Sequence, residues 1–356
     1  MKRIHIIIFG IGNVGSTLIG QIYKAKSKFS KAKNLDLNIP IVANSKLVLF
    51  GENTSGNTWE SDFSKFAVPY KMDDIISYVK SKNYDHVIAI DATASHDMAQ
   101  HYTALIKNGF HIVSANKIAN TLPLGFYNDL RENLKLHNRQ FLYETNVGAG
   151  LPIIETIKDI HNSGDTIRKI RGVFSGSLSY VFNTFSLENK SFSSVISKAG
   201  RLGLTEPDAR EDLSGNDVAR KLLILARELD LNVEFQNVKI ESLVPKQLNG
   251  KTTLKQFNAR LKELDAPFEA LKLKLPKGNV LRYVGELDVE NKTLEVKLVS
   301  EENTSTLGQL KGSDSIFEIF TDSYGDEPLT IQGAGAGKEV TARGLLSDIV
   351  KVSNKL

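Results

Sequence analysis

The stretch that decides the fold is IHIIIF at residues 4–9 followed directly by GIGNVG at residues 10–15. A continuous apolar run of this length is typical of a parallel strand that is covered on both faces. After the glycines, Leu18, Ile19 and Ile22 recur with the spacing of an amphipathic helix. The sequence therefore predicts that the chain begins with a buried strand, a glycine-rich turn and a helix.

The three glycines of this turn, Gly10, Gly12 and Gly15, have the G-x-G-x-x-G spacing of a dinucleotide-binding turn. The first glycine allows a tight turn, the second lets the backbone approach a pyrophosphate, and the third lets helix and strand pack closely. The N–H groups at the start of the helix would then face the phosphates. The alternative is a glycine-rich turn that serves packing only.

The residues after the second predicted strand, Ile39–Asn44, bear on the choice of cofactor. An NAD-preferring site usually has an Asp or Glu there to bind the ribose hydroxyl. This chain has Asn44-Ser45-Lys46 instead, and Lys46 could meet a 2′-phosphate. We therefore expect NADP(H) to be preferred, with NAD(H) as the alternative.

Further apolar segments alternate with helical patterns and predict the rest of a first domain. Strands are expected at residues 85–91, 110–114 and 141–144, with a helix ending near Lys107. Alternation of strands and helices is typical of a doubly wound α/β fold, so we expect a Rossmann-type parallel sheet. The lysines between Lys24 and Lys33 are interpreted as a solvated helix end and loop.

The pattern changes near Gly150 and predicts a second, α+β domain with a mixed sheet. A helix is expected to begin at Pro152, a favourable first-turn residue. The other expected elements are a strand at 167–174, half-exposed strands within 280–318, and helices at 178–185, 192–202 and 216–229. A glycine-rich turn at Gly333 leads into a helix at 340–352. We predict domains at 1–150, completed by 333–356, and at 151–332.

Composition and charge exclude several classes of function. The formal net charge of the 356 residues is +4 and no basic run suggests a nucleic-acid groove; no apolar run is long enough to span a membrane. The N-terminus is interpreted as a strand rather than a signal peptide, so the cytosol is expected. Because the chain has no cysteine, a thiolate-dependent oxidation of an aldehyde to an acyl product is excluded. Hydride exchange between an alcohol and an aldehyde needs no such group.

Three candidate ligand-binding residues follow the carboxyl ends of predicted strands, where ligands bind in open parallel sheets. Thr93 could lie along a nicotinamide. Lys117 could bind a carboxylate or the nicotinamide ribose, or be an ordinary surface lysine. Glu144, followed by the small-residue loop Asn146–Leu151, could form an oxygen-only cation site. On the residues alone, a tight turn between domains is the preferred interpretation of this loop.

The acidic segment 206–217 holds five carboxylates and leads into an apolar helix. Asp217 and Lys221 are four residues apart and share a helix face, at the edge of a buried stripe. Burial lowers the pKa of a lysine and a nearby Asp raises it, so Lys221 could exchange protons with a substrate oxygen. Glu206 and Asp212 could hold an ammonium group. The alternatives are a surface ion pair and two capping boxes, Ser214–Asp217 and Thr205–Asp208.

At these residues the sequence closely resembles homoserine dehydrogenase, in particular the monofunctional fungal type. The resemblance covers nearly the whole chain. It rests on GIGNVG at 10–15, Asn116-Lys117, VGAGLPII at 147–154, FSGSLSYVFN at 174–183, TEPD at 205–208, DLSGNDVARK at 212–221 and QGAGAG at 332–337. Small departures are Ser177 where threonine is common, Leu204 where tyrosine is frequent and Ala209 in place of proline. None of them removes a charged site residue.

The resemblance implies interconversion of L-homoserine and L-aspartate 4-semialdehyde, in threonine, methionine and isoleucine biosynthesis. It implies that Lys221 is the general acid/base, assisted by Lys117 and oriented by Asp217, and that Glu206, Asp212 and Asp217 bind substrate. It also implies a monovalent cation, expected to be sodium, held by Glu144 and the backbone carbonyls of Val147, Ala149 and Leu151. This reverses the preference for a plain turn. The second domain would form a homodimer through its sheet, and no C-terminal regulatory domain is expected.

The complete set of expected cofactor contacts is Gly10, Gly12, Asn13, Val14, Gly15, Lys46, Thr93, Ala94, Ser114, Lys117, Gly203 and Gly333. Two rival hypotheses remain open. One is an NADP-dependent reductase of another amino aldehyde or of a lysine-pathway intermediate. The acidic cluster distinguishes this rival, because the cluster demands a cationic group near the reacting carbon of the substrate. The other is a non-catalytic dinucleotide-sensing protein, which would have no need for Asp217 and Lys221 on one helix face. Aspartate-semialdehyde dehydrogenase is excluded because it needs a cysteine.

Overall fold

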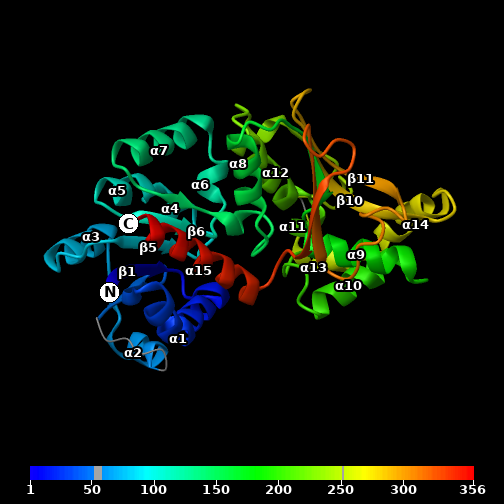
Figure 1. Cartoon of the computed structure of the whole chain (residues 1–356). Helices are drawn as coiled ribbons and strands as arrows, with labels where there is room; N and C mark the ends of the chain where they lie inside the picture. The colour runs from blue at the N-terminus through cyan, green and yellow to red at the C-terminus, as the bar shows by residue number, and fades with distance from the viewer. Residues whose placement is uncertain (52–57, 251) are drawn as a thin grey trace. The chain divides into compact units, whose positions relative to one another are not determined.

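The computed structural model of this chain describes residues 1–51, 58–250 and 252–356. These residues form two compact units (Figure 1). The first domain contains Met1–Gly150 and Gly337–Leu356, and the second contains Leu151–Ala336. Each has its own sheet, one mostly parallel and one mixed, so the predicted α/β fold with a second α+β domain is confirmed.

The elements of the first domain are the strands β1 (Lys2–Phe9), β2 (Leu35–Ala43), β3 (Leu47–Phe50), β4 (Val68–Pro69), β5 (Val87–Asp91), β6 (His111–Ser114) and β7 (Phe141–Leu142). Its helices are α1 (Asn13–Lys33), α2 (Trp59–Phe66), α3 (Met72–Ser81), α4 (His96–Gln100), α5 (Tyr102–Lys107), α6 (Ile118–Thr121), α7 (Leu124–Leu136), η1 (Glu144–Asn146) and α15 (Lys338–Lys355).

The strand order of the first sheet, β4-β3-β2-β1-β5-β6-β7, creates a switch point at β1. β1 pairs in parallel with β2 on one side and with β5 on the other. The chain thus turns in opposite directions on the two sides of β1, and ligands of doubly wound sheets bind in the crevice that such a reversal opens at the carboxyl ends. Gly10 follows the carboxyl end of β1 directly.

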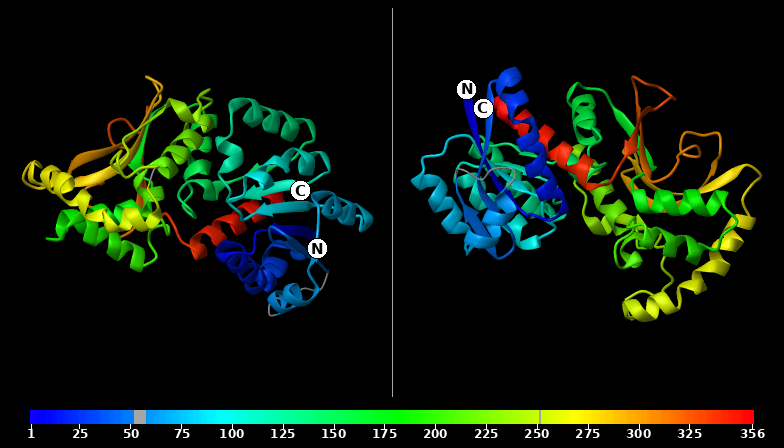
Figure 2. Two further views of the ribbon diagram at one scale, coloured as in Figure 1. Left: turned by 180° about the vertical axis from the view of Figure 1, so that it is seen from behind. Right: turned by 90° about the horizontal axis from the view of Figure 1, so that it is seen from below.

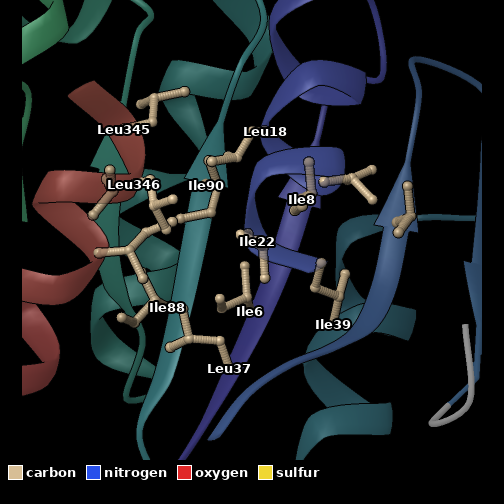
Figure 3. Packing of buried hydrophobic residues seen from close by; sticks show 14 of the residues in the cluster. Ile6, Ile8, Leu18, Ile22, Leu37, Ile39, Ile88, Ile90, Leu345 and Leu346 are labelled. Carbon is tan, nitrogen blue, oxygen red and sulfur yellow. The ribbon is translucent and has the colours of Figure 1, made fainter. Parts of the chain in front are cut away.

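The core of the first domain forms where one face of this sheet meets α1 and α15. Ile6, Ile8, Ile88 and Ile90 project from the central strands toward leucines and isoleucines of the two helices (Figure 3). All four isoleucines are fully buried, as expected for a parallel strand covered on both faces. Because α15 comes from the last residues of the chain, the C-terminal segment completes this core.

Both chain ends therefore belong to the first domain, and they lie near each other in both views of Figure 2. The Lys2 Nζ donates a hydrogen bond of 3.3 Å to the Ser353 carbonyl. In the same domain, the Gln21 side chain of α1 donates to the Glu339 carbonyl of α15 at 3.0 Å. These contacts tie the last helix to the first strand and the first helix.

The second domain has the strands β8 (Ile167–Val173), β9 (Val238–Ile240), β10 (Asn279–Asp288), β11 (Thr293–Glu302), β12 (Asp314–Thr321) and β13 (Leu329–Ala334). Its helices are α8 (Ile153–Asn162), α9 (Gly176–Leu187), α10 (Phe192–Arg201), α11 (Ala209–Leu213), α12 (Asn216–Glu228), η2 (Phe235–Asn237), α13 (Leu254–Ala259), η3 (Leu261–Leu264) and α14 (Asp265–Leu273). The sheet order is β13-β12-β8-β10-β11-β9, antiparallel except for the parallel pair β11 and β9.

Close packing between α12 and this sheet requires a glycine in β10. A Cβ at Gly285 would lie 2.8 Å from the Phe174 ring and 3.1 Å from the Val218 side chain. The Phe174 ring in turn stacks on Phe317, with ring centroids 4.5 Å apart. The predicted apolar stripe of α12 is buried, but Leu223, Ile224 and Ala226 are buried too, so this helix is enclosed on nearly every side.

Several local predictions were wrong. Helix α1 continues to Lys33, so the lysines of 24–33 lie on the helix and not in a loop. Glu144 lies in η1 because β7 ends at Leu142, where its short pairing with β6 ends. The predicted helix after β5 is divided into α4 and α5. Strand β3 and helices α3 and α7 were not predicted.

Neither expected capping box is present. The N-cap of α12 is Gly215, in the left-handed conformation at φ 77°. The Ser214 hydroxyl instead accepts from the Asn216 N–H at 3.2 Å. The N-cap of α11 is Asp208, whose carboxylate accepts from the Arg210 N–H at 3.1 Å. In both segments a short turn intervenes before the helix, which moves the start of the helix away from the predicted serine or threonine.

Among the described helices, none has both the length and the apolar character needed to cross a membrane.

Two glycines of α1 provide a matched test of the close approach in the first turn. A Cβ at Gly15 would lie 1.9 Å from the Gly10 carbonyl oxygen, whereas one at Gly20 would meet nothing within 4 Å. Replacing Gly20 with Ala should raise the free energy of unfolding by about 0.5–1 kcal/mol through helix propensity. Replacing Gly15 with Ala should lower it by about 1–3 kcal/mol because backbone must move. Urea unfolding of both variants measures the difference; equal stabilities would contradict the close approach.

Candidate active site

The glycine turn presents a helix N-terminus. Gly12 is the N-cap of α1, and no described side chain caps the helix there. A Cβ at Gly12 would meet no described atom within 4 Å, so space is open beside the first N–H groups. A helix of 21 residues that starts in this way is a natural site for the negative charge of a pyrophosphate. These residues fit the dinucleotide expected from the sequence.

A pocket of about 430 Å³ lies next to this turn, within the size range of small-molecule sites. It is lined by residues at the carboxyl ends of β1, β2 and β5 and by residues that begin α3 and α4. Gly10, Thr93 and Ala94 of the predicted cofactor set belong to this lining. The pocket therefore lies at the switch point of the sheet, as expected for a doubly wound fold.

The lysine in the pocket lining is Lys71 and not the predicted Lys46. Lys46 is exposed in the turn after β2, where its N–H donates to the Asn44 side chain at 2.8 Å. Lys71 precedes α3 and lines the pocket with Tyr70, Asp97 and His101. Burial, and then the charge of Asp97, raises the pKa of Tyr70. No sequence motif marked Lys71, because the β3–β4 segment that brings it to the pocket was not predicted.

The ends of β5 and β6 are joined by a buried polar network that the sequence did not reveal. Asp91 is the last residue of β5, and its carboxylate accepts from Thr93, Tyr102 and Asn116. Ser114 is fully buried and shares a 2.7 Å hydrogen bond with the Tyr102 hydroxyl. We therefore no longer expect Ser114 to contact the cofactor with its side chain. Lys117 is half-buried and is the N-cap of α6, three residues beyond the buried end of β6.

The predicted cation loop begins in η1 and is largely buried. The Glu144 side chain is buried, and its backbone N–H donates to the Asp348 carboxylate of α15 at 3.0 Å. Gly148 and Ala149 both have left-handed backbones, at φ 79° and 54°. That conformation is unfavourable for an alanine, so the surrounding packing must hold it. Val147 and Ala149 lie in the first domain, and Leu151 begins the second.

On the second domain, the Lys221 amine is buried, with 10% of its side chain exposed. It lies 2.8 Å from an Asp217 carboxylate oxygen and donates a 2.7 Å hydrogen bond to the Phe174 carbonyl. A lysine ammonium has three N–H donors, so these two partners leave one for another acceptor. The predicted pairing of Asp217 with Lys221 is present, together with a backbone carbonyl that was not foreseen.

The acidic residues before α12 are held by a chain of hydrogen bonds from α9. Ser177 donates a 2.6 Å hydrogen bond to one oxygen of Asp212, and the Glu206 N–H donates to the other at 2.9 Å. Burial raises the pKa of Asp212, and the Ser177 hydroxyl opposes that shift. The Glu206 side chain is exposed. The structure thus connects Asp212 with Ser177, the position where the sequence departs from the family threonine.

The remaining predicted cofactor residues are Asn13 and Val14 in the first turn of α1, Gly203 after α10 and Gly333 in β13. Gly203 and Gly333 belong to the second domain. Gly203 has a left-handed backbone and open space at its Cβ position. The predicted site residues thus form two sets, one on each domain.

Two family models match the chain, and together they span most of it. The model described as homoserine dehydrogenase, NAD binding domain, matches residues 10–144, and the model described as homoserine dehydrogenase matches residues 152–350. The first match contains the glycine turn and every pocket-lining residue except Phe9, and the second contains Asp212, Asp217 and Lys221.

Curated relatives give the same family. A homoserine dehydrogenase of Paracoccidioides brasiliensis is 35% identical over all of this chain and 99% of its own length. A bifunctional aspartokinase/homoserine dehydrogenase of Buchnera aphidicola is 38% identical over 98% of this chain. The chain spans only 38–43% of the length of the bifunctional relatives from Buchnera and maize.

Solved structures share the fold over the whole chain. A Candida auris protein of unknown function matches with a TM-score of 0.90 at 35% identity and covers 100% of this chain and 99% of its own. A hyperthermophilic archaeal homoserine dehydrogenase in complex with NADPH matches with a TM-score of 0.76 at 20% identity, over 100% and 99% of the two chains. The second likeness supports the fold alone. With both family models and the full-length fungal relative in agreement, the chain belongs to the homoserine dehydrogenase family of oxidoreductases.

Proposed function

We propose that this chain catalyses the NAD(P)-dependent interconversion of L-homoserine and L-aspartate 4-semialdehyde in threonine, methionine and isoleucine biosynthesis, in the cytoplasm. The observation that carries the proposal is the buried Lys221 amine, held by Asp217 and the Phe174 carbonyl within a segment that matches the family. A reductase of an amino aldehyde needs a fixed proton donor beside carboxylates that hold the substrate ammonium. Lys221, Asp212 and Glu206 supply these groups.

The chemistry divides between cofactor and protein. The nicotinamide cofactor supplies or takes up the hydride at the substrate carbon. Lys221 donates the proton that the developing alkoxide needs and stabilises its charge, and in the reverse direction it accepts the hydroxyl proton. Asp217 orients the amine. Asp212 and Glu206 hold the ammonium group of the substrate. Lys117 assists Lys221, or binds a carboxylate or the nicotinamide ribose.

The proposed role of Lys221 can be tested against Lys272, a second lysine of the same domain that donates to backbone carbonyls, those of Phe185 and Glu188. Replacing Lys221 with Ala should lower kcat by roughly 10²–10⁴ and leave NADPH affinity unchanged, because the proton donor is lost and the glycine turn is intact. Replacing Lys272 with Ala should leave kcat near the unmodified value. Homoserine oxidation followed at 340 nm provides the measurement. Near-normal kcat in the Lys221 variant would refute proton transfer by this amine.

The raised pKa of Asp212 predicts the pH dependence of substrate binding. The ammonium of homoserine needs an ionised carboxylate, so KM should rise as pH falls through the Asp212 pKa, and it should begin to rise at higher pH than for an ordinary aspartate. Removing the Ser177 hydroxyl with Ser177→Ala should move this rise to still higher pH, and Ser177→Thr should restore it. KM profiles measured from acidic to neutral pH give the answer; identical profiles for the Ala variant and the unmodified protein would contradict the role of the hydrogen bond.

We also propose that Lys71 binds the 2′-phosphate of NADP(H), with a smaller contribution from Lys46. Support comes from the pocket lining and from the absence of a carboxylate in Asn44-Ser45-Lys46. Lys71→Ala should raise KM for NADPH about 10-fold or more and leave KM for NADH unchanged, because a charge-assisted contact to phosphate is lost. Lys46→Ala should have the smaller effect. Steady-state kinetics with both cofactors measure this preference, and an equal loss for NADH would count against a phosphate contact.

Two further features belong to the proposal. A monovalent cation, expected to be sodium, would be held by Glu144 and the carbonyls of Val147, Ala149 and Leu151, which is consistent with the buried carboxylate and the left-handed Ala149.

A homodimer would form through the six-stranded sheet, whose strands β11 and β13 carry many half-exposed residues. The sodium dependence of activity and the mass in solution check these two features.

A further inference from the structure

Asp91 is a buried carboxylate with no part in the mechanism above. It ends β5, and 1% of the residue is exposed. Its backbone lies between Phe9 of β1 and Ser114 of β6 in the parallel register. The residues that follow Phe9 and Asp91 are Gly10 and the Thr93 segment, which line the pocket. Asp91 therefore lies behind the cofactor pocket and at the junction of three strand ends.

Each oxygen of this carboxylate accepts two hydrogen bonds from the segments around it. Oδ1 accepts from the Thr93 N–H at 2.8 Å and from the Thr93 hydroxyl at 2.7 Å. Oδ2 accepts from the Tyr102 hydroxyl at 2.7 Å and from the Asn116 side-chain amide at 3.0 Å. One oxygen thus holds the loop after β5, and the other holds both the start of α5 and the loop after β6.

The bonds continue beyond these first partners. The Thr93 hydroxyl accepts from the Ser95 N–H at 3.0 Å, and Asn116 donates to the Ser95 carbonyl at 2.8 Å. The Tyr102 and Ser114 hydroxyls share their own hydrogen bond, and the whole Tyr102 side chain is buried. Lys117 follows Asn116 directly. A change at Asp91 would therefore disturb Thr93 on one side and the start of α6 at Lys117 on the other.

The position of Thr93 also matters for the glycine turn. A Cβ at Gly10 would lie 2.8 Å from the Thr93 methyl group, so the Thr93 side chain is packed against the turn that begins the dinucleotide site. A change in how Thr93 is held would alter the wall of the pocket at this point. Burial without these donors would be unfavourable for a carboxylate, and the four donors offset much of that penalty. Burial raises the pKa of Asp91, and the hydrogen bonds from Thr93, Tyr102 and Asn116 oppose this shift.

We propose that Asp91 is a positioning residue for the cofactor site, acting through Thr93 and through the Asn116–Lys117 strand end. This inference rests on the proposed function only for the part that concerns turnover; the part that concerns cofactor binding needs only the dinucleotide domain. Asparagine at this position has one acceptor oxygen and one donor amide. Whichever side the amide faces, it meets an N–H donor of Thr93 or of Asn116, so one of the two loops is released.

The experiment compares Asp91→Asn with Asp36→Asn. Asp36 is a second buried carboxylate of the same sheet, but it lies beside Arg3 at the opposite end of β1, with a 2.8 Å ion pair to that arginine. NADPH affinity is measured without substrate by the fluorescence of the bound cofactor, together with kcat, KM for homoserine and Tm. Asp91→Asn is expected to weaken NADPH binding and to lower kcat, each by about 10- to 100-fold, because the pocket wall is misplaced. Asp36→Asn is expected to lower Tm and to leave NADPH binding and kcat unchanged.

The outcomes separate the possibilities. A folded Asp91→Asn protein with normal NADPH affinity and normal kcat would overturn the proposal, and so would an equal loss of affinity in Asp36→Asn. If Asp91→Asn does not fold, Tyr102→Phe removes a single donor to Oδ2 and should weaken NADPH binding measurably; unchanged binding there would overturn the proposal as well. If the unmodified protein binds NADPH but does not oxidise homoserine, the proposed function fails, while the comparison of NADPH affinities still decides the role of Asp91.

Discussion

The first domain depends on one close approach, that of the glycine turn to its own helix. A Cβ at Gly15 would overlap the Gly10 carbonyl, so α1 can start where it does only because that position has no side chain. With α1 in place, its apolar side chains meet the isoleucines of β1 and β5, and α15 joins the same core. The open helix N-terminus at Gly12 is then a consequence of the packing. The feature that permits the core to form also provides the phosphate-binding position.

In the second domain, the main constraint is that the amine of Lys221 lies within a largely apolar, buried helix. Helix α12 is buried on nearly every side, and burying a charged group without partners is unfavourable. The hydrogen bond to the Phe174 carbonyl and the ion pair with Asp217 offset that penalty for the Lys221 side chain. The carbonyl is available at this place because Phe174 follows β8 and its ring is packed between Gly172, Gly285 and Phe317. The proposed proton donor is thus positioned by the packing of an aromatic ring.

The predicted and unpredicted parts of the site differ in a regular way. The glycine spacing and the four-residue interval between Asp217 and Lys221 are local patterns, and a helix or turn places such residues together wherever it lies. By contrast, Asp91, Tyr102 and Asn116 are brought together from three separate segments. Each is an ordinary residue in its own stretch of sequence, and only the parallel register of β5 and β6 makes them neighbours. Lys71 was missed for the same reason, since the segment that carries it to the pocket has no marked periodicity.

What the sequence determined by itself was therefore the strand, turn and helix at the N-terminus, the alternation that implies a doubly wound sheet, and the helix face shared by Asp217 and Lys221. These follow from steric and periodic rules that act over a few residues. The tertiary structure decided which side chains line the pocket, which groups hold the Lys221 amine, and where the buried carboxylate of Asp91 finds its donors. Those contacts join residues far apart in the chain, and strand register and side-chain packing, which no local pattern specifies, select among the possible partners.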